Sequence, residues 1–502
     1  MEHFIEAVQM SFQLMSIIAI VLSTLFGVLV GIIPGLTATM AVALLTGLTF
    51  GFPPQIAVIS LIGVYVGSIS GGSQAAILLN IPGTPSSAAT ALDGHALSKQ
   101  GKAGLAIFLA TTSSMVGTII SAIFVFMLTP FLGRLGLHFH SYEYFLLALF
   151  GILMCGNLAG GDSLKGWIAG LMGLGIAMVG LDTISAYPRF AFGLPNLRAG
   201  LFLVPLMIAL FGVPEILKMF SKQVDKPIEM TDYKIMEGIK ILIKNPTALL
   251  RGGVIGSLLG IIPGVGEDVG GWMSYWSAKS SSKNPEEFGK GSYAGIIASE
   301  SGSNACKGGA FIPTLSLAVP GSTSAAVILA AFFMHGYRPG PLLALENPGF
   351  IYQVAIFLVL TSIAMIFIVI ALSRFTVKIL QFKKQTLMPV IFVFCVLGAF
   401  LVRYNMFDIR AMFIFGLVGF LLMYAKFPAA PLLLGMVLGE MAESNLIRGL
   451  RLSGGSVTPF FTRPISLFFV VVISLLILSQ FKWFQDGFAR VKTGISSKFK
   501  KD

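Results

Sequence analysis

The sequence has little charge. Only 11% of its 502 residues are charged, against roughly 25% in a typical soluble domain. From Ala7 to Leu92 there is no Asp, Glu, Lys, Arg or His. A chain with so little charge and 55% hydrophobic residues has too few polar groups to cover a water-exposed surface, which excludes an ordinary soluble globular protein.

Cysteine pairs and catalytic motifs are also missing. Cys155, Cys306 and Cys395 are isolated, so they indicate small packing residues and not a disulfide framework or zinc site. No His-Glu-x-x-His, Gly-x-Ser-x-Gly, Walker A or kinase motif occurs. These absences predict that the protein is not an enzyme and has no cofactor. Without an ATP-binding element, uphill transport would need an ion gradient or another subunit.

Long apolar runs are what the sequence has in abundance. A helix needs about 20 apolar residues to cross a membrane, and the clearest such runs are 13–33, 104–132, 351–373, 406–425 and 465–481. None alternates apolar and polar residues as strands of a membrane β-barrel do. Together with shorter, glycine-interrupted runs, they predict an all-α polytopic membrane protein with about 12 transmembrane helices.

Basic residues gather beside the apolar runs, in the segment 215–244 and in the tail 482–502. This distribution is typical of cytoplasmic segments of membrane proteins, and it outweighs a nucleic-acid interpretation of the net charge of +12. The N-terminal residues lack a basic n-region and a cleavage site, so we expect no cleaved signal peptide.

The two halves of the chain carry matching motifs. GVLVGIIPG begins at Gly27 and GSLLGIIPG at Gly256, and a Gly-Gly pair followed by Pro-Gly-Thr or Pro-Gly-Ser comes later in each half. This pattern predicts a first membrane repeat at 1–214, a linker at 215–244, a second repeat at 245–481 and a tail at 482–502. Glycines spaced by four predict close helix packing in both copies. They are Gly27, Gly31 and Gly35, and Gly252, Gly256, Gly260 and Gly264.

The orientation of the repeat follows from charge. The linker is basic and expected in the cytoplasm, whereas the N-terminus has Glu2 and Glu6 but no nearby Lys or Arg. If the N-terminus lies outside, equivalent helices enter from opposite faces and the repeat is inverted. Two long copies with Gly/Pro-broken apolar segments are typical of secondary transporters, in which matched breaks mark the binding site.

The breaks supply the candidate substrate site. Proline interrupts a helix and frees backbone polar groups, which are tolerated at membrane depth only against protein or a polar cavity. A half-helix that begins there points its amides and partial positive charge at a bound anion. We therefore predict two broken or re-entrant hairpins that bind substrate through Asn80, Pro82, Gly83, Thr84, Ser86, Ser87, Asn304, Pro320, Gly321, Ser322, Thr323 and Ser324.

Ion coupling is assigned to residues around the same breaks. Unwound carbonyls can hold Na⁺, and carboxylates within membrane segments mark ion or proton paths. The candidates are Gly35, Thr37, Gly264, Glu267, Asp268 and Glu300. Lys307 and Arg338 could balance an anionic substrate. The residues do not distinguish Na⁺ from H⁺ as the coupling ion, and they leave open a passive organic-anion channel or a transporter without partner subunits.

Five stretches of the sequence resemble the large membrane subunit of the tripartite tricarboxylate transporters. These are GIIPGLTATMAVALL, GGSQAAILLNIPGTPSSAATALDGH, GIIPGVGEDVGGWMSYWS, GGAFIPTLSLAVPGSTSAAV and PLLLGMVLGEMAESNLIRG. One departure stands out: where the family often has paired asparagines before the second Gly-Gly, this chain has Ser303-Asn304, followed by Cys306-Lys307. Only Asn304 carries over there.

The resemblance implies a particular transport system. Such subunits form the transport path for small carboxylates in the bacterial inner membrane and use an ion gradient. They pair with a small membrane subunit of about four helices and receive substrate from a periplasmic solute-binding protein. An elevator-type motion is the expected mechanism. Which carboxylate is carried is left open.

Overall fold

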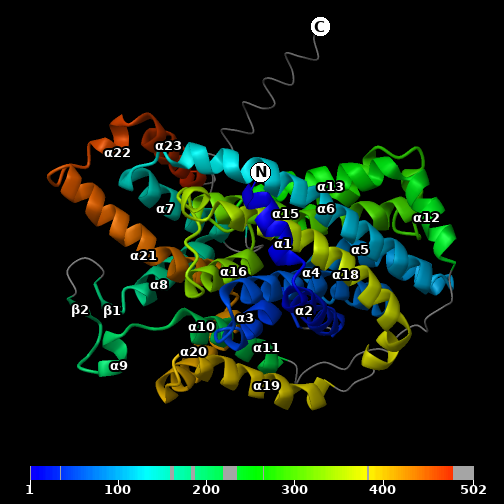
Figure 1. Ribbon diagram of the computed structural model, residues 1–502, viewed down its shortest axis with the longest axis horizontal. Helices are drawn as coiled ribbons and strands as arrows, with labels where there is room; N and C mark the ends of the chain where they lie inside the picture. Colours follow the sequence, from blue (N-terminus) through cyan, green and yellow to red (C-terminus); the bar gives the residue numbers. More distant parts are fainter. Residues whose placement is uncertain are drawn as a thin grey trace, which may run out of the picture. The chain divides into compact units, whose positions relative to one another are not determined.

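The computed structural model describes residues 2–33, 36–158, 163–182, 187–218, 234–263, 265–380 and 384–478, and Figure 1 labels their helices and strands. Nearly all of them are helical. Within these described ranges, five helices are long and apolar enough to cross a membrane, and eight shorter helices are also apolar. The predicted all-α polytopic membrane protein is therefore confirmed. The number of crossings and the duplication remain predictions.

The chain divides into two compact units that interleave in sequence. Unit 1 comprises residues 1–137 and 201–425, and unit 2 comprises residues 138–200 and 426–502. These units are defined by spatial compactness. The predicted repeats at 1–214 and 245–481 are defined by matching sequence motifs, so the two divisions do not test each other.

Unit 1 contains all of the predicted substrate and ion residues. Its elements up to Leu137 are α1 (Glu2–Ser11), α2 (Leu14–Ile32), α3 (Ala38–Leu48), α4 (Pro54–Leu79), η1 (Pro85–Ser87), α5 (Ala88–Lys99) and α6 (Ala103–Gly136). The others are α10 (Leu203–Met207), η2 (Ile208–Gly212), α11 (Val213–Lys218), α12 (Ile235–Lys244), α13 (Pro246–Ile261), α14 (Gly266–Ser280), η4 (Pro285–Glu287), α15 (Tyr293–Leu317), α16 (Thr323–Met334), α17 (Leu343–Glu346), α18 (Pro348–Leu380), α19 (Lys384–Leu401) and α20 (Met406–Tyr424).

Unit 2 is smaller. It consists of α7 (Ser141–Leu158), α8 (Ser163–Ala177), the antiparallel strands β1 (Gly180–Leu181) and β2 (Pro188–Arg189), α9 (Pro195–Arg198), α21 (Ala429–Leu452), α22 (Pro459–Thr462) and α23 (Pro464–Leu478). Glycines bring α8 and α21 into backbone contact. A Cβ on Gly173 would lie 2.1 Å from the carbonyl oxygen of Leu432, and one on Gly435 would lie 2.1 Å from that of Gly170.

In unit 1, glycines likewise allow close backbone contact within two helix pairs, α2–α4 and α13–α15. A Cβ on Gly31 of α2 would lie 2.1 Å from the Ser68 carbonyl oxygen of α4. One on Gly260 of α13 would lie 2.5 Å from the Cys306 carbonyl oxygen of α15. Because these neighbours are backbone atoms, only glycine permits the approach. The predicted packing role of the spaced glycines is therefore confirmed for these two helix pairs.

Helices α4 and α15 end in the same way. Asn80 follows α4 with φ 56°, and Ala318 follows α15 with φ 58°, so both lie in the left-handed region. The chain then folds back along the helix it has just left. The Gly83 amide donates to the Gly72 carbonyl at 3.2 Å, and a Cβ on Gly321 would lie 2.6 Å from Ala310 Cα.

Helix α6 is long enough to show which loops of unit 1 lie far apart. Its 34 residues extend about 50 Å, and it lies beside α15 (Figure 1). Next to its start, Lys102 donates to the Tyr293 hydroxyl at 3.1 Å and Gln100 donates to the Lys290 carbonyl at 2.9 Å. At its end, Gly136 packs against Pro341. The loops 100–102 and 335–341 therefore lie at opposite ends of α6.

Helices α13 and α14 form a hairpin. The Arg251 guanidinium, near the start of α13, donates to the Ser281 hydroxyl just beyond the end of α14. The Ser274 hydroxyl of α14 donates to the Gly252 carbonyl of α13 at 3.3 Å. The two helices therefore run in opposite directions, and the start of α13 and the end of α14 lie on the same side of unit 1.

Candidate functional site

The N-terminal parts of four short helical segments contact one another in unit 1. The Thr39 hydroxyl of α3 lies 3.0 Å from the Ser324 hydroxyl of α16. Ser322, the N-cap of α16, donates to Glu267 in the first turn of α14 at 3.1 Å. A Cβ on Gly271 of α14 would lie 3.1 Å from the Ser86 carbonyl oxygen of η1. The helices that begin after the four Pro-Gly motifs are thus linked, one to the next.

Glu267 is at the junction of α14 and α16. Its carboxylate is 9% exposed and accepts hydrogen bonds from Ser322 and from the hydroxyl of Tyr65, a fully buried residue of α4. The Tyr65 and Ser322 hydroxyls also lie 3.1 Å apart. The neighbouring Asp268 is exposed. Of the two adjacent carboxylates predicted for ion coupling, Glu267 is therefore the one held inside the protein.

Glu300 occupies a second polar cluster, between α4, α5, α6 and α15. It is fully buried, and its Oε1 accepts from Ser73 at 2.6 Å and from Thr90 at 2.5 Å. Its Oε2 accepts from Ser114 at 2.7 Å and from the Asn304 amide at 3.1 Å. Four donors from four helices satisfy this carboxylate, as a buried charge requires.

Lys307 extends the same cluster by one helical turn. It is fully buried, and its Nζ donates to Asn304 Oδ1 at 2.6 Å. Asn304, whose Nδ2 donates to Glu300 Oε2 at 3.1 Å, connects Lys307 to Glu300. The predicted role of Lys307 in balancing an anionic substrate stays a prediction.

The hydroxyl groups of the first helix break, at 84–87, mostly form hydrogen bonds within their own loop. Thr84 Oγ1 lies 2.9 Å from Ser86 Oγ, and the Ser87 hydroxyl donates to the Thr84 carbonyl at 2.7 Å. All three are buried, whereas Pro82 is half-buried and Asn80 is exposed. Asn80 thus ends α4 and does not join the polar clusters in this conformation.

The remaining predicted residues are placed as follows. Thr37 is the N-cap of α3 and accepts from the Met40 amide at 3.2 Å. Pro320 and Gly321 are buried, and Thr323 is half-buried at the start of α16. Gly35 and Gly264 lie outside the described residues.

Sequence reasoning missed Tyr65, Ser73 and Ser114 as members of the site. They sit within α4 and α6, and only Ser73 is next to a motif, the Gly71-Gly72 pair, which was interpreted for its backbone and not for this hydroxyl. In the sequence they are marked only by a polar side chain within a charge-free run. Many serine hydroxyls in such runs simply donate to a backbone carbonyl of the preceding turn of their own helix. Ser114 does so as well, because its hydroxyl lies 2.9 Å from the Ala110 carbonyl.

The Asp-Gly-His motif at 93–95 has a structural role. Asp93 Oδ1 accepts from three backbone amides of the loop after α14, those of Gly289, Gly291 and Ser292, at 2.7–2.9 Å. His95 Nδ1 lies 3.1 Å from the Ile77 carbonyl of α4. The motif therefore fastens α5 to that loop and to α4.

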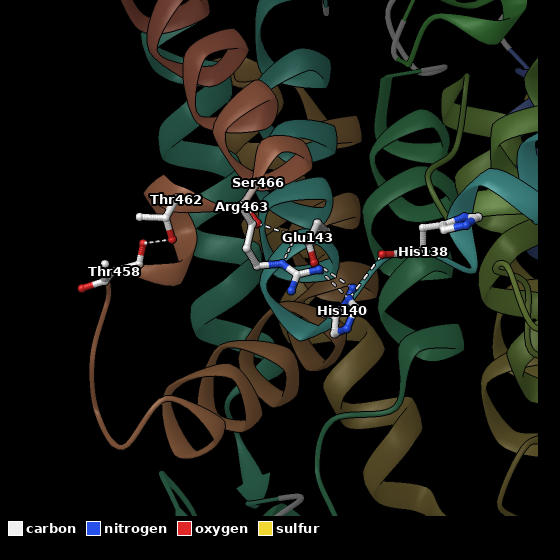
Figure 2. Close-up of polar contacts among 7 residues, drawn as sticks. All are labelled: His138, His140, Glu143, Thr458, Thr462, Arg463 and Ser466. Carbon is white, nitrogen blue, oxygen red and sulfur yellow. Dashed lines mark hydrogen bonds and ion pairs between the residues drawn. The ribbon is translucent and has the colours of Figure 1, made fainter.

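A further polar cluster in unit 2 is a rival candidate site. Figure 2 shows Arg463 pointing toward Glu143 and His140. The Glu143 carboxylate is buried and accepts from Arg463 Nε at 2.7 Å, from Ser466 at 2.6 Å and from the His140 amide at 2.7 Å. Both Glu143 oxygens have partners within the cluster, which joins α7 to α23 and favours a structural role.

The unit 1 clusters have the chemistry of a solute site. Helix N-termini and buried hydroxyls or amides can donate to carboxylate oxygens, and two buried carboxylates can hold a cation or proton. Among the residues that the structure describes, no group of three or more His, Cys, Asp or Glu side chains could hold a metal ion. A lipid-embedded helical protein whose broken helices meet around buried charges is, by class, a membrane transport protein.

Comparison with known proteins identifies the family. Residues 17–434 match the model of the tripartite tricarboxylate transporter TctA family, and the chain belongs to this family. It is therefore a transport protein and not an enzyme.

Two curated relatives come from Agrobacterium vitis. An uncharacterized 52.8 kDa protein in the TAR-I ttuC′ 3′ region is 34% identical over 443 residues, which cover 88% of each chain. An uncharacterized protein in the TAR-II ttuC′ 3′ region is 35% identical over 211 residues, 42% of this chain and 87% of that protein. No solved structure matches.

Proposed function

We propose that this chain is the transport-path subunit of an ion-gradient-driven importer of small carboxylates. Substrate binds where the N-terminal parts of η1–α5, α14 and α16 meet, next to the Glu267 and Glu300 clusters. The observation that carries the proposal is the chain of contacts that links Thr39 to Ser324, Ser322 to Glu267, and Gly271 to Ser86. Helix starts that are brought together at membrane depth favour an anion.

Matched geometry supports an internal, inverted repeat. The loop 100–102 follows α5, and its counterpart 335–341 follows α16. In an inverted repeat such counterparts belong on opposite sides of the membrane, and they lie at opposite ends of the 34-residue helix α6. The α13–α14 hairpin enters and leaves unit 1 on one side, as a re-entrant element would.

Family membership supports the assembly. The family name describes a tripartite system, and we propose that this chain works with a small membrane subunit and a periplasmic solute-binding protein that delivers the substrate. The proposed location is the bacterial inner membrane, with Na⁺ or H⁺ as the coupling ion and an elevator-type movement as the mechanism.

A passive anion channel is less well supported. A channel needs a continuous polar lining, whereas the polar groups of Glu300 and Asn304 are buried and paired within the protein. Accumulation of labelled citrate, malate or succinate in vesicles above the outside concentration, lost when the ion gradient is collapsed, is expected. Downhill flux alone would favour the channel.

The site itself is tested by hydroxyl removal. Thr84→Ala and Ser322→Ala should each lower uptake by about ten- to a hundredfold, because a hydrogen bond to a charged group is worth about 1.5–3 kcal/mol and about 1.4 kcal/mol is a factor of ten. Uptake of the labelled acids is normalised to the amount of protein in the membrane.

Thr462→Ala is the matched control, because Thr462 is an exposed hydroxyl of α22 in unit 2. It should leave uptake unchanged. Normal transport by both Thr84→Ala and Ser322→Ala at normal expression would refute the proposed site.

A further inference from the structure

Helix α12 is too short and too charged to cross a membrane. Its ten residues, IMEGIKILIK, extend about 15 Å, about half the thickness of the hydrocarbon layer. Three of them, Glu237, Lys240 and Lys244, are charged. Helix α13 begins two residues later, at Pro246, and Figure 1 shows α12 running across the direction of α13 and not in line with it. A short charged helix that turns away from a membrane helix in this way is a candidate for the membrane surface.

Two faces of α12 are apolar, one buried and one exposed. Gly238 and Leu242 are buried, and a Cβ on Gly238 would lie 2.3 Å from a ring carbon of Phe108 in α6. On the neighbouring face, large apolar side chains recur every four residues and remain uncovered. They are Ile235, Ile239 and Ile243, which are 50%, 37% and 72% exposed, with the 62% exposed Met236 beside them. A row of this kind marks a surface that binds another apolar phase or molecule.

The third face of α12 is charged. Lys240 and Lys244 each follow an isoleucine and project about 100° away from it, and both are exposed. Among the residues that the structure describes, neither ammonium group has an ion-pair partner. A helix that combines an apolar face with neighbouring lysines is typical of elements that lie in the membrane interface.

The segments beside α12 add to the positive charge. Residues 99–102, 234–251 and 279–290 carry nine exposed Lys or Arg side chains and three exposed Glu side chains. They lie at one end of unit 1, because Gln100 donates to the Lys290 carbonyl at 2.9 Å and the start of α13 contacts the end of α14. A basic surface beside an exposed apolar helix face complements anionic lipid headgroups, which attract Lys and Arg close to a membrane.

We infer that α12 is a membrane-surface helix that binds anionic phospholipid. Its isoleucine face lies at the acyl chains, and Lys240 and Lys244, together with the basic segments, hold the headgroup phosphates. A helix of the small membrane subunit could also cover the apolar face. The charge favours lipid, because an apolar helix offers no anion to the nine basic side chains around α12. The inference does not depend on the proposed function, since it involves neither the substrate nor the coupling ion.

Fluorescence quenching by lipid shows which face of α12 meets the acyl chains. Ile243→Cys and Glu237→Cys, introduced one at a time, are labelled with a fluorescent maleimide, and the unsubstituted chain measures labelling of the native cysteines. The full chain is placed in vesicles of phosphatidylcholine and phosphatidylglycerol that contain a lipid with a nitroxide near the top of its acyl chain. Glu237 is exposed on the charged side, so the label at Ile243→Cys should be quenched at least about twofold more strongly.

Two results of this experiment overturn the inference. Equal quenching at the two positions would mean that the isoleucine face does not enter the membrane. Loss of quenching at Ile243→Cys when the small membrane subunit is added would assign the face to that subunit.

Thermal unfolding tests the contact with headgroups. Wild type in nanodiscs should gain on the order of a few degrees in Tm when phosphatidylglycerol is added to phosphatidylcholine. Added salt should remove much of this gain, because exposed charges are screened. Lys240→Glu with Lys244→Glu lowers the net charge of the three segments from +6, nine basic less three acidic side chains, to +2. This double variant should lose most of the gain and keep its Tm in phosphatidylcholine alone.

Arg134→Glu with Arg338→Glu makes the same change of charge at the other end of α6, where both arginines are exposed. It should keep the gain from phosphatidylglycerol. No gain in wild type, or equal loss of the gain in the two double variants, overturns the binding of anionic phospholipid by α12.

Discussion

Asp93 is the residue whose loss has the clearest structural consequence. Its Oδ1 holds three backbone amides, those of Gly289, Gly291 and Ser292, and the side chain is fully buried. Asp93→Ala should lower stability by about 2–3 kcal/mol, because a buried amide left without an acceptor, as at Ser292, costs about 1–3 kcal/mol. The amides of Gly289 and Gly291 are less buried and can partly regain hydrogen bonds from water. Thermal unfolding of the purified protein measures it.

Asp93→Asn is the matched control. It keeps one side-chain oxygen to face the amides, so it should lose clearly less stability than Asp93→Ala. Equal losses for the two variants would mean that Asp93 acts through its charge and not through the three amide contacts.

At the scale of single residues, the sequence predicted the breaks but not which polar side chains meet. Glu267 and Asp268 are adjacent, and a helix turns by about 100° per residue, so two neighbouring carboxylates face different surroundings. The sequence cannot say which one is buried until the packing of α14 against Tyr65 and Ser322 is known. The structure buries Glu267 and exposes Asp268.

Helix pairs in unit 1 depend on glycine. Gly31→Ala in α2 and Gly260→Ala in α13 would place a Cβ 2.1 Å and 2.5 Å from a backbone oxygen of the partner helix. The backbone cannot yield as a side chain can, so each substitution should destabilise the protein by about 3 kcal/mol. Thermal unfolding and the yield of monodisperse protein are the measurements.

Gly175→Ala is the matched control for both substitutions. Gly175 lies in α8 with no atom within 4 Å of an added Cβ. Because alanine favours helix over glycine by up to about 1 kcal/mol, this variant should be neutral or slightly stabilised. If Gly175→Ala lost as much stability as Gly31→Ala, the losses at Gly31 and Gly260 could not be attributed to contact with the partner helix.

At the scale of elements, local chemistry was a good guide. Pro-Gly motifs and glycines spaced by four act through the backbone, so they predicted where helices break and which faces approach closely. The partners were not predictable: α14 contacts η1, and α3 contacts α16. Such pairings join segments about 180 residues or more apart and are decided by tertiary packing, which leaves no periodicity in a chain that is hydrophobic almost throughout.

At the scale of the whole molecule, the open question is the orientation of the repeat. Hydropathy predicted a polytopic helical chain, because lipid forces backbone groups into helices. Orientation depended on a few charges at the N-terminus and in the linker, which carry less information than the packing of α6. The structure offers two positions from which the orientation can be measured directly. Lys290 and Arg338 lie in exposed loops near opposite ends of α6.

Thiol labelling of these two loops tests the inverted repeat. Lys290→Cys and Arg338→Cys, introduced one at a time, should react with a membrane-impermeant maleimide from opposite sides of the membrane. If the basic linker is cytoplasmic, Lys290→Cys reacts only after permeabilisation, because Gly238 of α12 packs on Phe108 near the same end of α6. The native Cys306 and Cys395 are buried and should contribute little background, which the unsubstituted chain measures. Labelling of both positions from one side would mean that the two halves enter the membrane in the same direction, and the paired breaks would then need another explanation.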